Sequence, residues 1–284
     1  MVHVCRVDTY LTTRIEIAGI GSRLENMDTR LLRDQYGDSG NLSSRVALHA
    51  RFSTNPKGWA DWLFEQFDLR GATRILELGC GPGGLWGGRI QTLPSGCQLV
   101  LSDASPGMVS EARSVLGEER VDFQVIDAQA IPWADGSFDR VIANHMLYHI
   151  SDLSRALAEI ARVLTADGVF YAATNGKTHM HELHDIIRES VPSLHELSSS
   201  FTLENGGDLL RSHFGEIAVH RYDDDLIVSS AQALSAYVRS MGSLMDATEA
   251  QFREIDQTIA DMVAREGRIA ISKDSGLFVS TRLA

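Results

Sequence analysis

A glycine-rich loop is the first feature of the sequence that could hold a ligand. Residues 75–84 read ILELGCGPGG, a short apolar segment followed by glycines at positions 79, 81 and 83. Glycine lets the backbone turn tightly and approach a ligand because no Cβ intervenes, and a helix after such a loop presents unpaired N–H groups. The loop is therefore predicted to bind a ligand, although its spacing also satisfies the dinucleotide-binding fingerprint and a plain structural turn.

Three acidic residues narrow the kind of ligand. Asp103 ends the next apolar segment, where a carboxylate can accept hydrogen bonds from both hydroxyls of a ribose. Asp127 follows a third apolar segment and could accept a hydrogen bond from the amino group of an adenine. Glu77, two residues before Gly79, suits a cationic ligand and would repel a pyrophosphate. Together these acids favour a positively charged nucleoside cofactor over a dinucleotide.

Polar side chains that could carry out chemistry follow a fourth apolar segment, in the sequence NHMLYH at 144–149. Imidazole titrates near neutral pH, so His145 or His149 could remove a proton from an attacking hydroxyl or amine, while Tyr148 orients the acceptor. The alternative is that these histidines cap the next helix or pack in the core. The three residues are the candidate catalytic groups.

The apolar periodicity predicts the elements that must position these residues. Strands and helices alternate from residue 74 onward, which is typical of a parallel sheet with helices on both faces, an α/β fold. The carboxyl ends of such strands meet at one edge, so the loop, the acids and the histidines should lie together. The expected strands are 74–78, 98–102, 122–125, 138–143, 169–174, 216–222 and 277–283, and the expected helices are 45–52, 59–67, 106–116, 152–164, 179–190, 206–211, 231–241 and 247–266.

At these motifs the sequence resembles the class I S-adenosylmethionine-dependent methyltransferases, over about residues 45–176. The segment ELGCGPG matches the cofactor loop of that family, and Asp103 and Asp127 match its two later acidic positions. FDRVIAN at 138–144 and RVLTADGVF at 162–170 are similar to its later motifs. The resemblance implies a Rossmann-like, seven-stranded, mostly parallel sheet whose last strand is antiparallel. It also implies S-adenosylmethionine bound across the carboxyl ends of the first strands.

The motifs and the resemblance together predict the residues that touch this cofactor. Glu77 and Asn144 are expected to orient its methionine part, and Met108 to cover the adenine. Tyr36 and Arg45 belong to a segment that could close over the cofactor, where Arg45 could pair with its carboxylate. Helix capping by the aspartates, core packing of Met108 and solvation of Tyr36 and Arg45 are the alternatives. The full set of expected contacts is Glu77, Gly79, Cys80, Gly81, Gly83, Asp103, Ala104, Met108, Asp127, Ala128, Asn144, Arg45 and Tyr36.

Two further segments could bind a metal ion. HMHELH at 179–184 carries three histidines but lacks the H-E-x-x-H spacing, so polar lining or exposed surface is the preferred interpretation. The run Asp223-Asp224-Asp225 could chelate, but a solvated turn after a strand is favoured. No metal is expected.

Composition limits the partners and the compartment. The formal net charge is −12 and no run of Lys or Arg appears, which disfavours binding to nucleic acid. The three cysteines form neither a disulfide framework nor a zinc site, so a reducing cytoplasm is expected. No stretch approaches the ~20 apolar residues of a membrane span, and the N-terminus does not read as a signal peptide. The oligomeric state is left open.

These observations predict a cytoplasmic methyltransferase that acts on the oxygen or nitrogen of a small-molecule acceptor by direct displacement. The alternatives are an RNA base methyltransferase, a NAD-dependent dehydrogenase and a cofactor-binding module without catalysis. The expected organisation is an N-terminal extension and lid (1–44), a cofactor-binding core (45–176) and a C-terminal part (177–284). In that last part, a helical insertion at 177–212 is expected to cover the acceptor. Residues 1–26 are expected to be dispensable for folding, with Met27 a plausible start.

Overall fold

The computed structural model describes residues 40–192, 200–241, 245 and 247–283 of the chain. Tyr36, Met27 and most of the expected N-terminal extension lie outside the described residues. The expectation that residues 1–26 are dispensable for folding concerns that part of the chain and stays a prediction.

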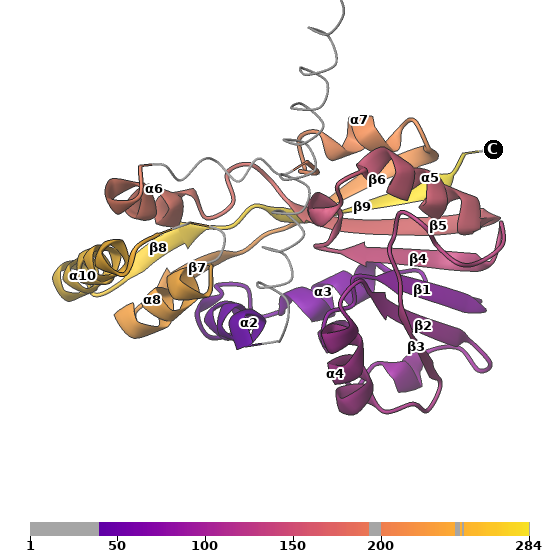
Figure 1. Cartoon of the computed structure of the whole chain (residues 1–284), viewed down its shortest axis with the longest axis horizontal. Coiled ribbons are helices and arrows are strands. Elements are labelled where there is room, and N and C mark those ends of the chain that lie inside the picture. The colour runs from indigo at the N-terminus through magenta and orange to yellow at the C-terminus, as the bar shows by residue number, and fades with distance from the viewer. Residues whose placement is uncertain (1–39, 193–199, 242–244, 246, 284) are drawn as a thin grey trace, which may run out of the picture.

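A seven-stranded sheet is the centre of the larger part of the molecule (Figure 1). The strand order is β3-β2-β1-β4-β5-β9-β6, and β9 runs antiparallel to both of its neighbours whereas the other adjacent strands are parallel. The predicted Rossmann-like sheet with an antiparallel strand near its edge is confirmed. The strands are β1 (Arg74–Leu78), β2 (Gln98–Asp103), β3 (Val121–Val125), β4 (Phe138–Asn144), β5 (Leu164–Asn175), β6 (Phe214–Tyr222) and β9 (Ser275–Arg282).

Helices cover both faces of this sheet because alternate strand residues are apolar on both sides. Ile75 of β1 packs in one cluster, and its neighbour Leu76 packs in the other. The Ile75 face is covered by α3 (Trp59–Gln66), by the short 3-10 turns η1 (Gly84–Trp86) and η2 (Ile90–Thr92), and by α4 (Pro106–Leu116). The Leu76 face is covered by α5 (Leu153–Val163) and α7 (Gly206–Leu210).

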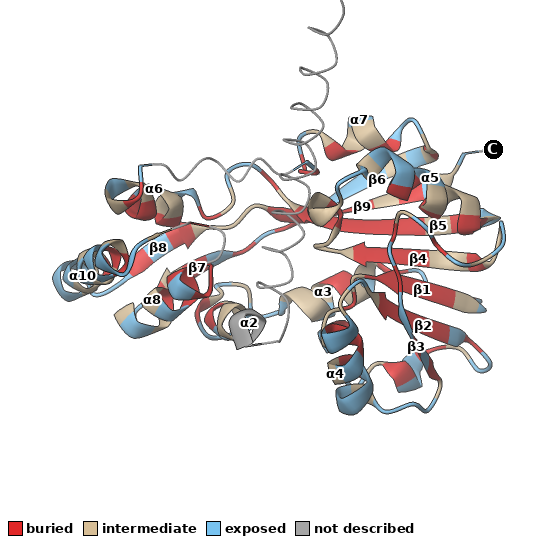
Figure 2. Ribbon diagram, viewed as in Figure 1, coloured by how far each residue is buried: buried red, intermediate tan, exposed pale blue. Residues whose placement is uncertain are grey.

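A second group of elements lies to one side of the sheet and is called the cap here (Figure 1). It consists of α2 (Gly40–Phe52), α6 (His181–Ser190), α8 (Ala231–Ser240), α10 (Glu249–Glu266) and the antiparallel pair β7 (Asp225–Val228) and β8 (Ile269–Ser272). Side chains from all of these elements form an apolar cluster of their own. The helices turn buried residues inward and exposed ones outward (Figure 2).

The cap is built from separate stretches of the chain, which the sequence did not reveal. Periodicity predicted its helices, but β7 and β8 were missed because four residues give little alternation to detect. Among the described residues of the expected insertion at 177–212, α6 and the flanking Met180 and Val191 pack in the cap. Phe201 of that segment packs edge-on against Phe278 of β9, with ring centroids 5.6 Å apart, in the core of the sheet. Phe201 therefore belongs to the sheet and does not cover an acceptor.

A buried ion pair lies in the two connections that join the sheet to the cap. Asp224, between β6 and β7, pairs with Lys273, between β8 and β9, and their side chains are 0% and 6% exposed. Asp224 also accepts hydrogen bonds from the Ser53 hydroxyl at 2.6 Å and from the Thr54 and Asn55 backbone N–H groups at 3.0 and 2.9 Å. Burial raises the pKa of this carboxyl, but hydrogen bonds from Lys273 and Ser53 outweigh it and lower the pKa overall. The expected solvated turn at 223–225 is thus wrong for Asp224, which links the α2–α3 connection to the β6–β7 and β8–β9 connections.

Candidate functional site

The glycine loop lies at the carboxyl end of β1, where β1 meets β2. Gly79, Gly81 and Gly83 all have positive φ, at +68°, +54° and +81°. A Cβ on Gly79 would lie only 2.6 Å from Cβ of Met146, so the backbone there is both left-handed and crowded. The Cys80 thiol is buried, and burial raises its pKa. The loop has a backbone shape that strongly favours glycine, as the sequence predicted.

Asp103 stands beside this loop at the end of β2. One carboxylate oxygen accepts the Gly81 N–H at 3.0 Å, and the other accepts the Ser105 N–H at 2.8 Å. Ser105, and not Asp103, caps α4, since its side chain accepts the N–H of Met108. The Ala104 backbone N–H is a third donor to this carboxylate. An ionised carboxylate can accept about four hydrogen bonds, so Asp103 keeps some accepting capacity. That capacity fits the two hydroxyls of a ribose.

Glu77 is buried on the same side of β1 as Ile75. The side chain is 1% exposed and accepts a hydrogen bond from Trp86 Nε1 at 2.6 Å. Burial raises the pKa of Glu77 to about 8; the indole bond opposes this, and the charge of Asp103 adds to it. A cation placed beside this carboxyl would favour its charged form. Glu77 therefore fits the ammonium group of an amino-acid cofactor.

The other expected cofactor contacts lie at the same edge of the sheet. Asn144 ends β4, and its side-chain oxygen accepts the N–H of the Trp59 indole at 3.4 Å. Asp127 follows β3 and is exposed, with its carboxylate accepting the backbone N–H of Gln129 at 2.9 Å. Three residues at the carboxyl ends of β2 and β3 differ in exposure: Ala104 is exposed, whereas Met108 and Ala128 are buried. Their contacts with a cofactor stay predictions.

Arg45 lies in the cap, on α2. Its guanidinium donates to the Ser240 hydroxyl at 3.2 Å and to the Ser240 carbonyl at 3.0 Å, which fastens α2 to α8. After burial, the charge of Arg45 is the second cause that lowers the pKa of His149. Its predicted pairing with the cofactor carboxylate remains a prediction.

The candidate catalytic residues directly follow β4. His145 has φ +54°, an uncommon backbone conformation for a non-glycine residue, and its N–H bonds the Ala173 carbonyl of β5 at 3.1 Å. Tyr148 and His149 lie in the short turn η3 (Leu147–His149), with their rings 4.5 Å apart. Burial lowers the pKa of both histidines to about 4, so both imidazoles are neutral near neutral pH and able to accept a proton.

Neither histidine caps the helix that follows. Asp152 has that role, since its carboxylate accepts the Arg155 N–H at 3.0 Å at the start of α5. The capping alternative is therefore wrong for His145 and His149.

An aromatic wall beside His145 was missed from the sequence. Trp59 and Trp62 of α3 stack at 5.1 Å, and Tyr222 at the end of β6 lies 5.3 Å from Trp59. The His145 ring is 5.0 Å from Trp59, so the wall reaches the candidate catalytic residues. The helical spacing of the two tryptophans indicated one apolar face. The direction of that face depends on how α3 docks, which the sequence does not show.

The histidine-rich segment does not assemble a metal site. His181 is exposed and contacts the Thr178 carbonyl at 3.1 Å, whereas His179 accepts the Asp274 backbone N–H at 3.1 Å. Within the described ranges, no group of three or more His, Cys, Asp or Glu side chains is arranged to hold a metal ion.

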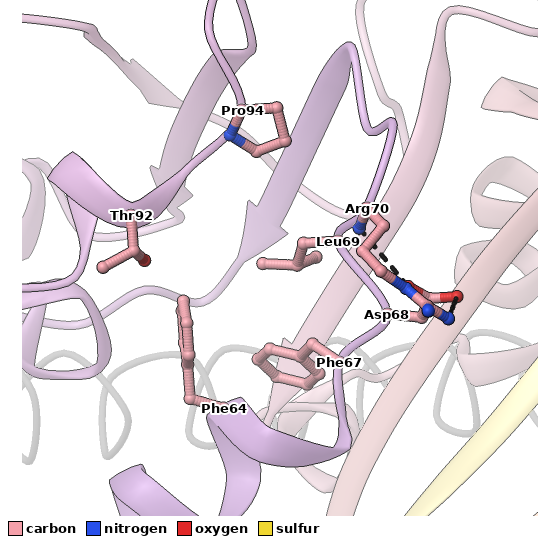
Figure 3. A pocket seen from close by; sticks show the side chains of 7 residues that line it. All are labelled: Phe64, Phe67, Asp68, Leu69, Arg70, Thr92 and Pro94. Atoms are coloured by element: carbon pink, nitrogen blue, oxygen red, sulfur yellow. Dashed lines mark hydrogen bonds and ion pairs between the residues drawn. The ribbon is translucent and has the colours of Figure 1, made fainter.

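A surface hollow lies at the opposite edge of the sheet (Figure 3). Its residues precede β1 and β2, so it belongs to the amino ends of the strands, whereas the glycine loop lies at the carboxyl end of β1. The lining residues are Phe64, Phe67, Asp68, Leu69, Arg70, Thr92 and Pro94. In the part of the chain that the structure describes, no helix combines the length and apolar character needed to cross a membrane.

Comparison with known proteins agrees with this geometry. A family model described as a methyltransferase domain matches residues 76–172, from β1 into β5. A malonyl-[acyl-carrier protein] O-methyltransferase of Enterobacter lignolyticus is 30% identical over 223 residues, which cover 76% of this chain and 82% of that protein. The ubiquinone/menaquinone biosynthesis C-methyltransferase UbiE of Desulfotalea psychrophila is 34% identical over 110 residues, or 39% of this chain and 44% of that protein.

A solved structure shares the fold. The phosphoethanolamine N-methyltransferase 2 of Haemonchus contortus, in complex with S-adenosyl-L-methionine, superposes with a TM-score of 0.58 at 17% identity, covering 91% of this chain and 60% of that one. The chain belongs to the class I S-adenosylmethionine-dependent methyltransferases. It is a methyltransferase enzyme, and S-adenosylmethionine is its cofactor. The expected dehydrogenase alternative is thereby set aside.

Proposed function

We propose that this enzyme methylates an oxygen or nitrogen atom of a small-molecule acceptor in the cytoplasm. When bound, the cofactor supplies an electrophilic methyl group on a sulfonium, which passes to the acceptor by direct displacement. The observation that carries the proposal is the position of His145 and His149 directly after β4, on either side of Met146, whose side chain lies against Gly79 of the glycine loop.

Different residues at the carboxyl edge of the sheet hold different parts of the cofactor. Asp103 accepts the ribose hydroxyls with the capacity left by its backbone hydrogen bonds. Glu77 faces the amino group, and Asn144 orients the methionine part. Asp127, exposed after β3, accepts the adenine amino group. Gly79 and Gly81 let the backbone approach without steric conflict.

The histidines handle the proton that leaves the acceptor. An acceptor hydroxyl or amine loses a proton as its oxygen or nitrogen bonds the methyl carbon, and a neutral imidazole of His145 or His149 takes it. Tyr148 orients the acceptor. Because the positive charge disperses as the methyl group moves, catalysis depends mainly on alignment and exclusion of water. A base of this kind serves O–H and N–H acceptors, which supports O- or N-methylation.

The cap supports a small acceptor. Its elements pack together on one side of the sheet, and the charge of Arg45 on α2 acts on His149. We propose that the cap, made from the C-terminal part of the chain together with α2, covers the acceptor. The named reactions of the relatives include O-, C- and N-methylation, and the net charge of −12 disfavours RNA.

Measuring which class of acceptor receives the methyl group tests this function. The full chain is incubated with methyl-labelled S-adenosylmethionine and, separately, with a metabolite extract, bulk RNA or bulk protein. Label should enter a low-molecular-weight product from the extract, and the Asp103→Ala variant should lose that transfer. Label in the RNA or protein alone would contradict the proposal, and tight cofactor binding without transfer to any fraction would favour a non-catalytic module.

A further inference from the structure

Three histidines and one lysine lie near one another at the junction of sheet and cap. Lys273 Nζ is 5.2 Å from the ring centroid of Tyr222, which packs on Trp59, and Trp59 in turn packs on His145. His179 accepts the backbone N–H of Asp274, the residue after Lys273. His49 comes from α2, His145 from the end of β4, His179 from the β5–α6 connection, and Lys273 from the β8–β9 connection. The positive charge of Lys273 acts on all three imidazoles. These four residues are called the histidine cluster here. They come from segments far apart in the chain, so the fold itself brings them together.

The acids near this cluster are already occupied. Asp224 accepts hydrogen bonds from Ser53, from the Thr54 and Asn55 backbones, and from Lys273. Asp274 pairs with Arg221 at 2.5 Å and accepts the Thr178 hydroxyl at 3.0 Å. The charge of Lys273 lowers the pKa of His145 and His179, whereas at His49 the Asp224 carboxylate opposes the effect of Lys273.

The hydrogen bonds of His179 fix which of its ring nitrogens carries the proton. Nδ1 accepts the Asp274 backbone N–H at 3.1 Å, so in the neutral ring the proton must be on Nε2. His179 thus presents an N–H donor on the side of the ring away from the Asp274 backbone. Together with the Lys273 ammonium, this gives the cluster two donors that suit an anionic oxygen.

A buried ring nitrogen of His49 is the second feature that supports a ligand at the cluster. This atom, Nδ1, has no hydrogen-bond partner among the described residues. The ring packs edge-on against Tyr237, with ring centroids 5.9 Å apart, but this contact gives the nitrogen no hydrogen bond. A buried polar atom without a partner is destabilising by about 1–3 kcal/mol, and such an atom calls for an explanation such as a ligand.

We propose that the histidine cluster binds an anionic oxygen group, a carboxylate or a phosphate, on the methyl acceptor. This inference rests on the proposed function, and it defines the class of acceptor. His145 belongs to the cluster, and Tyr148 links it to the other candidate base: the Tyr148 ring lies 6.4 Å from that of His145 and 4.5 Å from that of His149. The anionic group would hold the acceptor on the cluster side while the reacting oxygen or nitrogen faces His149.

Anion binding should change the protonation of the cluster. Burial, with the charge of Lys273, keeps the pKa of His49 and His145 at about 4 and that of His179 well below its usual range. The other charged or titratable groups that act on these rings are Asp224, His149 and His184. The negative charge of a bound anion would oppose the effect of the Lys273 charge and favour protonated imidazoles. Anion binding should therefore take up protons, and its affinity should rise as the pH falls.

Two conservative variants separate ligand binding from a purely structural role. His49→Phe keeps the ring that packs on Tyr237 but removes the unpartnered nitrogen. His179→Asn keeps an acceptor for the Asp274 N–H but removes the Nε2–H donor. Both leave the Asp224–Lys273 pair intact. His220→Asn, on an exposed position of β6, is the matched control.

The test titrates malonate, inorganic phosphate and the neutral analogue malonamide into the full chain saturated with S-adenosylhomocysteine. Histidine ring resonances are followed by NMR. One of the two anions should give saturable shifts at His49 and His179 with a Kd on the order of 1 mM, and malonamide should give none. The tighter anion identifies the acceptor group as carboxylate or phosphate. Both cluster variants should weaken binding by about tenfold or more, and the control should not.

The outcomes distinguish this inference from the proposed function. Failure of the chain to bind S-adenosylhomocysteine in calorimetry would overturn the proposed function and this inference with it. Normal cofactor binding with no saturable shift for either anion, or with equal shifts in the variants, would overturn the anion site alone. If His49→Phe does not fold, His179→Asn decides.

Discussion

Replacing Glu77 by Gln should stabilise the cofactor-free enzyme, and the gain should grow with pH. Below pH 4.5 this carboxyl is protonated in both the folded and the unfolded chain, so it contributes no pH-dependent difference. Between pH 4.5 and about 8 it ionises only in the unfolded chain, which increasingly favours unfolding. Above about pH 8 it is charged in both states and the full penalty remains. A Gln side chain never ionises and escapes this penalty.

The size of the effect follows from the folded and ordinary pKa values. The difference between about 8 and 4.5 corresponds to about 5 kcal/mol of unfolding free energy, since one pKa unit is worth about 1.4 kcal/mol. The Gln oxygen can still accept the Trp86 indole N–H, so that hydrogen bond survives. Between pH 5 and pH 8 the stability of Glu77→Gln relative to the wild type should therefore rise by about 4 kcal/mol.

Urea unfolding of the cofactor-free chains at the two pH values measures this difference. Glu119→Gln, at an exposed position, is the matched control and should show little change. The same Glu77→Gln variant should bind S-adenosylmethionine at least about tenfold more weakly at pH 8, because it lacks the charge expected to face the cofactor's amino group. A stability change that is independent of pH, or a variant less stable than the wild type at pH 8, would refute the reasoning.

Four other predictions follow from the same structure. Asp103→Ala should weaken S-adenosylmethionine binding by roughly 1–3 kcal/mol in calorimetry; an unchanged affinity would remove Asp103 from the site. Gly79→Ala should lower both the melting temperature and the cofactor affinity, because its Cβ would meet Met146 at 2.6 Å and φ is +68°. Asp224→Asn should lower the unfolding free energy by about 3–5 kcal/mol, and wild-type stability should fall in acid as this carboxyl protonates; urea unfolding against pH checks both. The acid limb of kcat/KM should lie near pH 4 to 5, since His149 has a pKa of about 4; a limb near pH 6.5 would contradict the buried, neutral imidazole.

The parts of the site that the sequence predicted correctly depend on short stretches of chain. The glycine positions, the strand before them and Asp103 follow from a local pattern whose physical requirements are local too, such as the positive φ of Gly79. The parallel sheet follows from alternating apolar segments. The strand ends were predicted to within a residue or two, except for β5, which begins at Leu164 and not at residue 169.

The remaining features depend on contacts between distant segments. Asp224 reads as part of an acidic surface run, yet Lys273 and the connection after α2 bury it. Phe201 reads as part of a lid but fills the core beside Phe278. The cap combines α2 with elements after β6, so no single stretch of sequence carries its apolar cluster. His49 and His179 belong to segments far apart in the sequence, and only the folded chain brings both into the field of Lys273.

A crystal structure of the full chain with S-adenosylhomocysteine tests the central claim most directly. The account predicts that the ribose hydroxyls bond the Asp103 carboxylate, that the amino group faces Glu77, and that the sulfur lies toward His145 and His149. A nucleoside bound elsewhere, such as in the hollow at the amino ends of the strands, would contradict the account. So would a sulfur turned away from both histidines.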